Sequence, residues 1–136
     1  MGLKPDIMTY NNLIWGVGNV GKLDLSRKYY DELIKAGLRA NVYTFGALIH
    51  ACAKSKNYMQ ALQYLSVMES AGIRPNLVVL TSVMEACTEC GRYQEALGIM
   101  TKMRELGITP DNALINSAIK ACCLNGAVDE AEQLAQ

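Results

Sequence analysis

The sequence repeats itself with a fixed step of 35 residues. A short phrase that ends in Asp or Asn occurs as GLKPD, AGLRAN, AGIRPN and LGITPD, with its last residue at Asp6, Asn41, Asn76 and Asp111. A constant period of about 20 to 50 residues is typical of a solenoid, in which one supersecondary unit is copied and stacked. The period constrains the fold strongly, because each unit buries its apolar face only against its neighbours.

Two amphipathic runs follow one another in every period. The first has apolar residues at helical spacing, as in Tyr10, Leu13, Ile14 and Val17, and this pattern recurs at each step of 35 residues. The second run ends at Gly37 and at its equivalents, and a proline follows two of these glycines closely. A glycine followed by a proline ends a helix, because glycine adopts the left-handed cap and proline cannot continue the hydrogen-bond pattern. The sequence therefore predicts an A helix and a B helix in each unit. The expected fold class is all-α, a right-handed α-solenoid of stacked helix-turn-helix repeats.

The expected organisation is a single repeat domain over residues 1–136. The chain reads as a segment excised from a longer array, whose cut ends expose apolar residues such as Met1, Leu3 and Leu134. Such ends favour self-association. The predicted units are the end of a preceding repeat at 1–6, repeat 1 at 7–41, repeat 2 at 42–76, repeat 3 at 77–111 and a partial repeat 4 at 112–136.

Composition narrows the possible functions. Hydrophobic residues make up 51% of the chain, which is enough for a continuous core, and the net charge is zero. Zero net charge disfavours indiscriminate phosphate binding, which leaves a basic footprint. No apolar run is long enough to span a membrane. The sequence also contains no nucleophile–base pair, paired carboxylates or phosphate loop, so we expect no enzyme activity, cofactor or small-molecule substrate.

The five cysteines suggest packing rather than metal binding. Cys52, Cys87 and Cys122 occupy one equivalent apolar position in successive repeats, so we expect them in the core. Cys87 and Cys90 have CxxC spacing, but no second pair or suitably placed histidine accompanies them. We therefore predict no metal site.

The Asp or Asn at the end of each phrase comes just before an A helix. A side-chain oxygen at this position commonly caps the free backbone N–H groups, so we expect an N-cap.

The units that open like I7-M-T-Y-N-N-L-I14 and close like A71-G-I-R-P-N76 resemble the pentatricopeptide repeat family, in its simple tandem class. The tetratricopeptide repeat differs in period and in its opening motif. The resemblance covers the whole chain. It implies binding of single-stranded RNA, one base per repeat. The resemblance also implies that the chain is part of a protein that processes, stabilises or splices RNA in a chloroplast or mitochondrion.

The resemblance implies two base-reading positions per repeat, one early in the A helix and one at the end of the repeat. By the family's pairing rules, Thr81 with Asp111 is similar to a guanine reader, and Asn11 with Asn41 to a reader of cytosine over uracil. The second pair departs from the pattern because glycine offers no side chain, and it leans to adenine or reads nothing. With RNA parallel to the protein, the implied site is 5′-C/U, A or any base, G, C/U-3′. The predicted base-reading residues are Asn11, Asn41, Gly46, Asn76, Thr81, Asp111 and an unpaired Asn116.

A third position implied by the resemblance wedges between neighbouring bases. Its residues are Met8, Tyr43, Val78 and Ala113. For Met8 and Tyr43 the alternative is packing between repeats. Further along the A helices, Lys54 and Lys120 are candidates for phosphate contact, within a row that also includes Trp15, His50 and Glu85. His50 itself is expected to be an ordinary surface histidine.

A protein-interaction or dimerisation scaffold is the alternative function. The neutral charge, the few cations and the missing side chain at Gly46 favour it. The charge of the A-helix face discriminates between the two functions, since a basic stripe favours RNA and an acidic or apolar groove favours protein.

Overall fold

The computed structural model describes residues 6–135, which form eight α-helices and no strand. The A helices are α1 (Ile7–Asn19), α3 (Val42–Lys54), α5 (Leu77–Glu89) and α7 (Asn112–Leu124). The B helices are α2 (Leu23–Lys35), α4 (Tyr58–Ser70), α6 (Tyr93–Glu105) and α8 (Val128–Leu134). The predicted all-α solenoid of helix-turn-helix repeats is confirmed.

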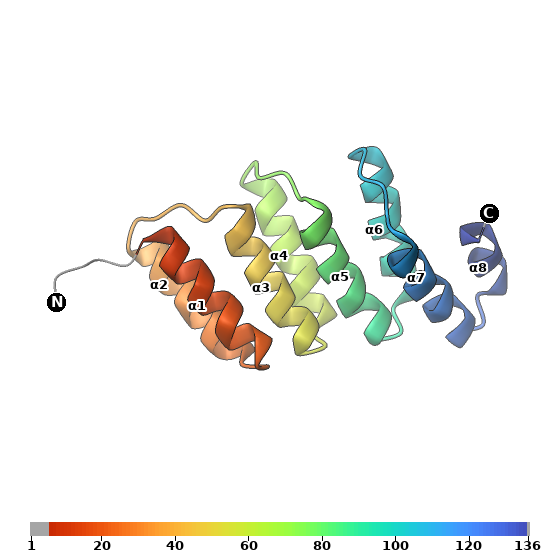
Figure 1. Ribbon diagram of the computed structural model, residues 1–136, viewed down its shortest axis with the longest axis horizontal. Coiled ribbons are helices and arrows are strands. Elements are labelled where there is room, and N and C mark those ends of the chain that lie inside the picture. The colour runs from red at the N-terminus through yellow and green to blue at the C-terminus, as the bar shows by residue number, and fades with distance from the viewer. Residues whose placement is uncertain (1–5, 136) are drawn as a thin grey trace.

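The helices form two layers. The A helices lie side by side, α1 against α3, α3 against α5 and α5 against α7, and each also packs on its own B helix (Figure 1). No B helix of the described chain approaches another B helix as closely. Because the A helices are packed more closely than the B helices, the stack is tighter on the side of the A layer. That side is the expected ligand surface of a solenoid.

Helix ends follow one local design. A residue with positive φ follows each helix from α1 to α7, and a backbone hydrogen bond closes the turn, as from Lys22 N to Val17 O at 3.0 Å. Glycine takes this position six times, and Lys56 takes it once, with a φ of 54°. Lys56 therefore occupies the turn position that glycine has at the equivalent steps, Gly21, Gly91 and Gly126.

One large buried core joins the first repeats, and a smaller cluster of Cys122, Ala127 and Ala131 follows at the C-terminal helices. Ile14, Leu48, Leu80 and Met84 belong to one buried cluster that extends from α1 to α7. Leu48 is 0% exposed, whereas Leu13, its equivalent one repeat earlier, is 38% exposed. Among the described residues α3 has an A-helix neighbour on both sides and α1 on one side only, which accounts for the difference.

The three equivalent cysteines are buried as predicted, Cys52 and Cys87 in this core and Cys122 in the smaller cluster beside α8. Cys52, Cys87 and Cys122 are buried, and burial raises the pKa of Cys52 and of Cys87 to about 12. Thiols with such a high pKa are poor nucleophiles at neutral pH. Within residues 6–135 no group of three or more potential metal ligands comes together. Nor is any helix of the described chain long and apolar enough to cross a membrane.

Between the B helices, contacts are made by long side chains. Lys102 of α6 bonds both carboxylate oxygens of Glu69 in α4 at 2.9 Å. Arg74 reaches from one inter-repeat loop to the next and donates to Leu106 O at 2.6 Å. The Tyr30 and Tyr64 rings of α2 and α4 meet edge to face, with centroids 5.9 Å apart. These contacts fix the spacing of the repeats from the outer side.

Candidate functional site

The last residue of each predicted repeat caps the next A helix. Backbone N–H groups donate to the side chains of Asp6, Asn41, Asn76 and Asp111, at distances of 2.8 to 3.1 Å. The bond from Thr9 N, followed by that from the Thr9 hydroxyl, lowers the pKa of Asp6. The capping interpretation is therefore confirmed. Capping also fixes where the rest of each side chain points.

Each cap occupies one oxygen and leaves the other polar atom available. Asn76 accepts from Val79 N through Oδ1, and its Nδ2 donates no hydrogen bond to any group within residues 6–135. Asp111 accepts from Leu114 N through Oδ1, and its Oδ2 is likewise without a partner in the described chain. An Asn at this position thus presents a donor, whereas an Asp presents an acceptor.

The first predicted pair meets directly. Asn11 Nδ2 donates to Asn41 Oδ1 at 3.2 Å, although 30 residues separate the two. The Thr44 hydroxyl donates to Asn11 Oδ1 at 2.6 Å and accepts from Asn41 N at 3.1 Å. The junction of repeats 1 and 2 therefore presents a closed network of three polar side chains at the start of α3.

The sequence analysis missed Thr44. Its equivalents at the other steps are Thr9, Val79 and Leu114. A polar residue at a position that is apolar in the two later repeats was the available signal. The 35-residue alignment alone could not show that its hydroxyl would join the two asparagines.

The second predicted pair borders an open space. Gly46 and Asn76 line a cavity of about 260 Å³ on the A layer, together with side chains from α1, α3 and α5. A Cβ atom built on Gly46 would meet Val79 Cγ2 at 3.6 Å, an ordinary contact. Gly46 thus contributes no side chain to the cavity, and a Cβ atom at this position would be tolerated.

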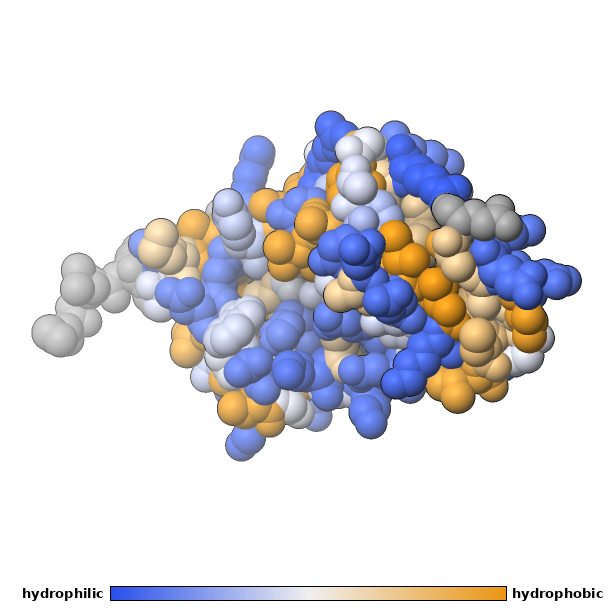
Figure 2. Space-filling view, turned by 45° about the vertical axis from the view of Figure 1, so that its right-hand side comes forward, coloured by the Kyte–Doolittle hydropathy of each residue, from blue (hydrophilic) through white to orange (hydrophobic). Residues whose placement is uncertain are grey.

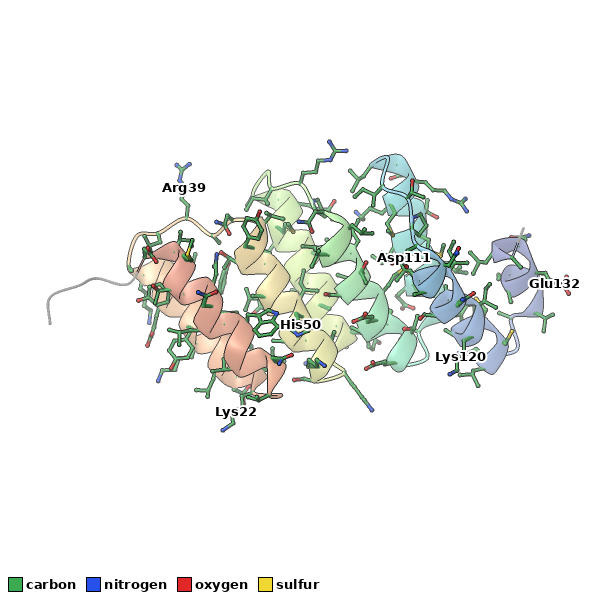
Figure 3. The ribbon with its side chains drawn as sticks, viewed as in Figure 1. Lys22, Arg39, His50, Asp111, Lys120 and Glu132 are labelled. Atoms are coloured by element: carbon green, nitrogen blue, oxygen red, sulfur yellow. The ribbon has the colours of Figure 1, made fainter. Side chains whose placement is uncertain are left out.

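The remaining predicted readers lie further along the same face. Thr81 in α5 is half-buried and Asp111 is exposed, and no hydrogen bond joins their side chains within the described residues. Asn116, on α7, is exposed. Figure 3 shows Asp111 at the start of α7 and Lys120 further along this helix.

The predicted wedge residues form an exposed row. Met8, Tyr43 and Val78 are 68%, 72% and 67% exposed, each in the second position of its A helix, and Ala113 is exposed in the same position of α7. Packing between repeats, the alternative for Met8 and Tyr43, does not account for side chains this exposed. The row places an apolar group at every repeat along one edge of the A layer.

Charge on the A layer is sparse and balanced. Its helices carry Lys54, Lys120, Glu85 and Glu89, and α1 carries no charged residue. Lys54 lines a hollow together with Glu85 and Glu89, so carboxylates lie beside one of the two predicted phosphate contacts. The face is neither a basic stripe nor an acidic groove.

Trp15 and His50 make a contact between repeats that the sequence analysis missed. Their rings stack with centroids 5.6 Å apart and an interplanar angle of 6°, and His50 Nε2 lies 3.1 Å from Asn19 Oδ1. Partial burial, and then the charge of Lys54, lowers the pKa of His50, while Glu85 opposes this. His50 is therefore a partly buried residue at the junction of two repeats. Figure 3 places His50 between α1 and α3.

Comparison with known protein families identifies the repeats. The family model described as the pentatricopeptide repeat domain matches residues 28–88 and 68–125, and the model described as the PPR repeat matches residues 8–38. No curated protein is matched by the sequence.

Several solved structures share the fold. PPR10 from maize, described as a pentatricopeptide repeat protein, is similar with a TM-score of 0.89 and 19% identity, over 98% of this chain and 19% of that chain. The PPR domain of Arabidopsis thaliana protein-only RNase P 1, solved in complex with tRNA, gives a TM-score of 0.87 and 17% identity, over 99% and 72% of the two chains. The nuclear proteinaceous RNase P 2 of A. thaliana gives a TM-score of 0.85 and 14% sequence identity. The match covers 98% of this chain and 30% of that chain. The chain thus spans about a fifth of the maize protein and under a third of RNase P 2.

Proposed function

Because the chain belongs to the pentatricopeptide repeat family, we propose that it is a sequence-selective module for single-stranded RNA in which each repeat contacts one base. The observation that carries the proposal is the meeting of Asn11 and Asn41 on the A layer, at 3.2 Å, next to the row of exposed wedge residues. The similar folds of PPR10, solved with an 18-nt psaJ RNA element, and of the RNase P 1 domain solved with tRNA add support.

The proposed repeat boundaries lie at the residues that cap the A helices. We divide the chain at Asn41, Asn76 and Asp111, so that each repeat ends with the residue that caps the next A helix. The side chain then has two roles, because one oxygen holds the helix and the other polar atom faces a base. Residues 1–5 lie outside the described part of the chain, so the first repeat phrase enters the proposal only through Asp6.

Base selection follows from what each capped side chain offers. Asp111 Oδ2 accepts hydrogen bonds, which suits the N–H groups of guanine, and the family resemblance pairs Asp111 with the half-buried Thr81. Asn76 Nδ2 donates, which suits a ring nitrogen acceptor. The Asn11–Asn41 pair offers both kinds of group and is assigned to a pyrimidine, as is Asn116. The proposed site therefore remains 5′-C/U, A or any base, G, C/U-3′.

The A layer favours contacts to bases over contacts to phosphates. Only Lys54 and Lys120 are available as cations on its helices, and Glu85 and Glu89 offset them. The wedge row offers stacking surfaces, and stacking contributes about 1–3 kcal/mol per base. We therefore assign most of the binding free energy to base contacts.

A second candidate function is a scaffold that binds protein or a second copy of the chain. Figure 2 shows hydrophobic side chains toward the C-terminal helices, where Leu124 and Val128 are exposed. Leu134, which was predicted to be exposed there, is half-buried against the core. Met1 and Leu3, the predicted contacts at the other end, lie outside the described residues.

The cellular location is a separate proposal. An address in a chloroplast or mitochondrion, within a protein of RNA processing, rests on the family resemblance. The similar A. thaliana RNase P 2 is described as nuclear, so the fold by itself does not select a compartment. No catalytic step is assigned to these repeats.

The proposal is tested by fluorescence-anisotropy titration of short labelled RNAs at about 50 mM salt, where phosphate contacts are strong. The RNAs are a C-A-G-C run, its variants at the third base, and poly-A. Asp111→Asn keeps the capping oxygen but replaces the free acceptor with a donor, so preference at the third base should move from guanine toward adenine. Asp6→Asn makes the same change of charge at a cap without a predicted partner, and it serves as the matched control.

Two results would contradict the proposal. One is binding that ignores both the RNA sequence and Asp111→Asn, which leaves only backbone contacts. The other is the absence of binding to any RNA by the folded protein, which would favour the scaffold.

A further inference from the structure

The cavity at Gly46 has the features of a recognition site for one nucleobase. Two predicted wedge residues, Tyr43 and Val78, lie at its rim, and both members of the predicted reading pair of repeat 2, Gly46 and Asn76, line it. Its volume of about 260 Å³ falls just below the range of about 300–1,000 Å³ that holds drug-sized ligands. A single base is therefore an occupant of suitable size.

The missing side chain at Gly46 opens the cavity toward an aromatic wall. Trp15 and His50 both line it, one helical turn beyond Asn11 and Gly46 respectively. Trp15 is 50% exposed although it stacks on His50, so part of its ring remains available to a ligand. His50 is held in place by its contact with Asn19 Oδ1 at 3.1 Å. No equivalent wall exists at the next step, because the residues there are Glu85 and Lys120.

The polar groups at the cavity suit a ring nitrogen. Asn76 Nδ2 is without a partner in the described chain and can donate a hydrogen bond. The polar atoms of Asn11 already form hydrogen bonds with Asn41 and Thr44, so they are less available to a ligand. Purines carry acceptor nitrogens on both rings, and their two-ring surface stacks over a larger area than that of a pyrimidine.

We propose that repeat 2 selects a purine by the shape of this cavity, and that Trp15 and His50 are specificity-determining residues which contact the second ring of the base. A pyrimidine held at the same backbone position does not reach the aromatic wall and leaves that part of the cavity to water. Repeat 2 thus discriminates by size and stacking where a side chain would otherwise read the base edge. This inference rests on the proposed RNA-binding function.

The test compares four RNAs, C-A-G-C, C-G-G-C, C-C-G-C and C-U-G-C, with two readouts. Anisotropy gives the affinity, and we expect the two purine RNAs to bind about 5- to 10-fold more tightly than the pyrimidine RNAs, an effect within the range of one stacking contact. Fluorescence of Trp15, the single tryptophan of the chain, reports the contact without any substitution. Saturable quenching by the purine RNAs, and much weaker quenching by the pyrimidine RNAs at saturation, is the expected result.

Two variants examine the cavity itself. Gly46→Leu fills it and should reduce the purine preference to less than about 2-fold, since the base then loses the stacking contact. Gly98→Leu is the matched control, because a Cβ atom at Gly98 meets nothing within 4 Å and this residue lies on B helix α6. Trp15→Leu removes the aromatic ring but keeps an apolar side chain, and it should also abolish the preference.

The outcomes separate this inference from the proposed function. If RNA binds with guanine preferred at the third base, but the second base shows no purine preference or Trp15 is not quenched, this inference is overturned and the proposed function stands. A purine preference that survives both Gly46→Leu and Trp15→Leu also overturns it. Absence of binding to all four RNAs by the folded wild-type chain contradicts both.

Discussion

Repeats 1 and 2 place equivalent residues in the same frame and build different surfaces from them. In repeat 1, Asn11 joins Asn41 and Thr44 in a closed hydrogen-bond network. In repeat 2, Gly46 leaves a cavity beside Asn76. An Asn side chain caps the next A helix at the end of both repeats, and the two capped helices are each 13 residues long. The helix ends therefore determine the backbone, and one A-helix position determines the chemistry of the site.

The largest expected contrast concerns the core beneath these sites. Leu48→Ala should lower the free energy of unfolding by about 2–5 kcal/mol, because its side chain is fully buried. The equivalent change Leu13→Ala should cost about 1 kcal/mol or less, since Leu13 is partly exposed on the open side of α1. Urea unfolding followed by circular dichroism measures both. Equal losses would show that α1 and α3 are packed alike in solution.

Loss of the two N-caps should lower the free energy of unfolding by amounts that differ less than those for the two leucines. Asn41→Ala should cost about 2 kcal/mol and Asn76→Ala about 1 kcal/mol, which are the upper and middle values for a lost N-cap. The difference arises because Asn41 also accepts from Asn11 and belongs to a capping box with Thr44. Asn76→Asp keeps the capping oxygen and should leave stability nearly unchanged. A cost for Asn76→Asp as large as that for Asn76→Ala would contradict the assignment of the cap to Oδ1.

Substitutions in the turns between A and B helices should change the free energy of unfolding by smaller amounts, and the change in repeat 2 should be stabilising. Lys56 ends the A helix of repeat 2 with a positive φ, where the other repeats have glycine. Lys56→Gly should stabilise the protein by about 0.5–1 kcal/mol, because glycine adopts this conformation without steric cost. Gly91→Lys, at the equivalent turn of repeat 3, should destabilise it by a similar amount. Thermal unfolding measures the pair, and no change in either variant would contradict the strain assigned to Lys56.

The smallest expected effect is a pH dependence at the junction of the two repeats. Burial lowers the pKa of His50 from its usual 6.5, so the folded state favours neutral imidazole. Its stabilising contribution is complete above about pH 6.5 and is lost as pH falls through the lower folded-state value. Trp15 fluorescence should therefore decrease with a midpoint below pH 6.5, as protonated imidazole quenches the stacked indole. His50→Gln should remove the transition. A midpoint above pH 6.5 would contradict the lowered pKa of His50.

The sequence predicted the elements that depend on local chemistry. The 35-residue step, the glycine stops and the apolar spacing located all eight described helices and the buried cysteines. The caps at Asn41 and Asn76 followed from their position before a helix. These features need no knowledge of what packs against what, because each repeat carries its own helix and turn signals.

Contacts between repeats could not be predicted in the same way. The row Trp15, His50, Glu85 and Lys120 was visible in the sequence, but its first two rings stack only because α1 and α3 lie side by side. The bridge from Thr44 to Asn11 likewise depends on the distance between two helices, which the repeat period does not contain. The cavity at Gly46 is set by the side chains of three A helices at once.

The most direct test of base reading by repeat position converts one site into the other. Gly46→Asn gives repeat 2 the Asn–Asn pair of repeat 1, and its Cβ atom would make only an ordinary contact, with Val79 Cγ2 at 3.6 Å. Anisotropy titration with the four RNAs that differ at the second base measures the outcome. The account predicts that the second-base preference changes from purine to pyrimidine while guanine remains preferred at the third base. An unchanged second-base preference, with binding retained, would contradict it.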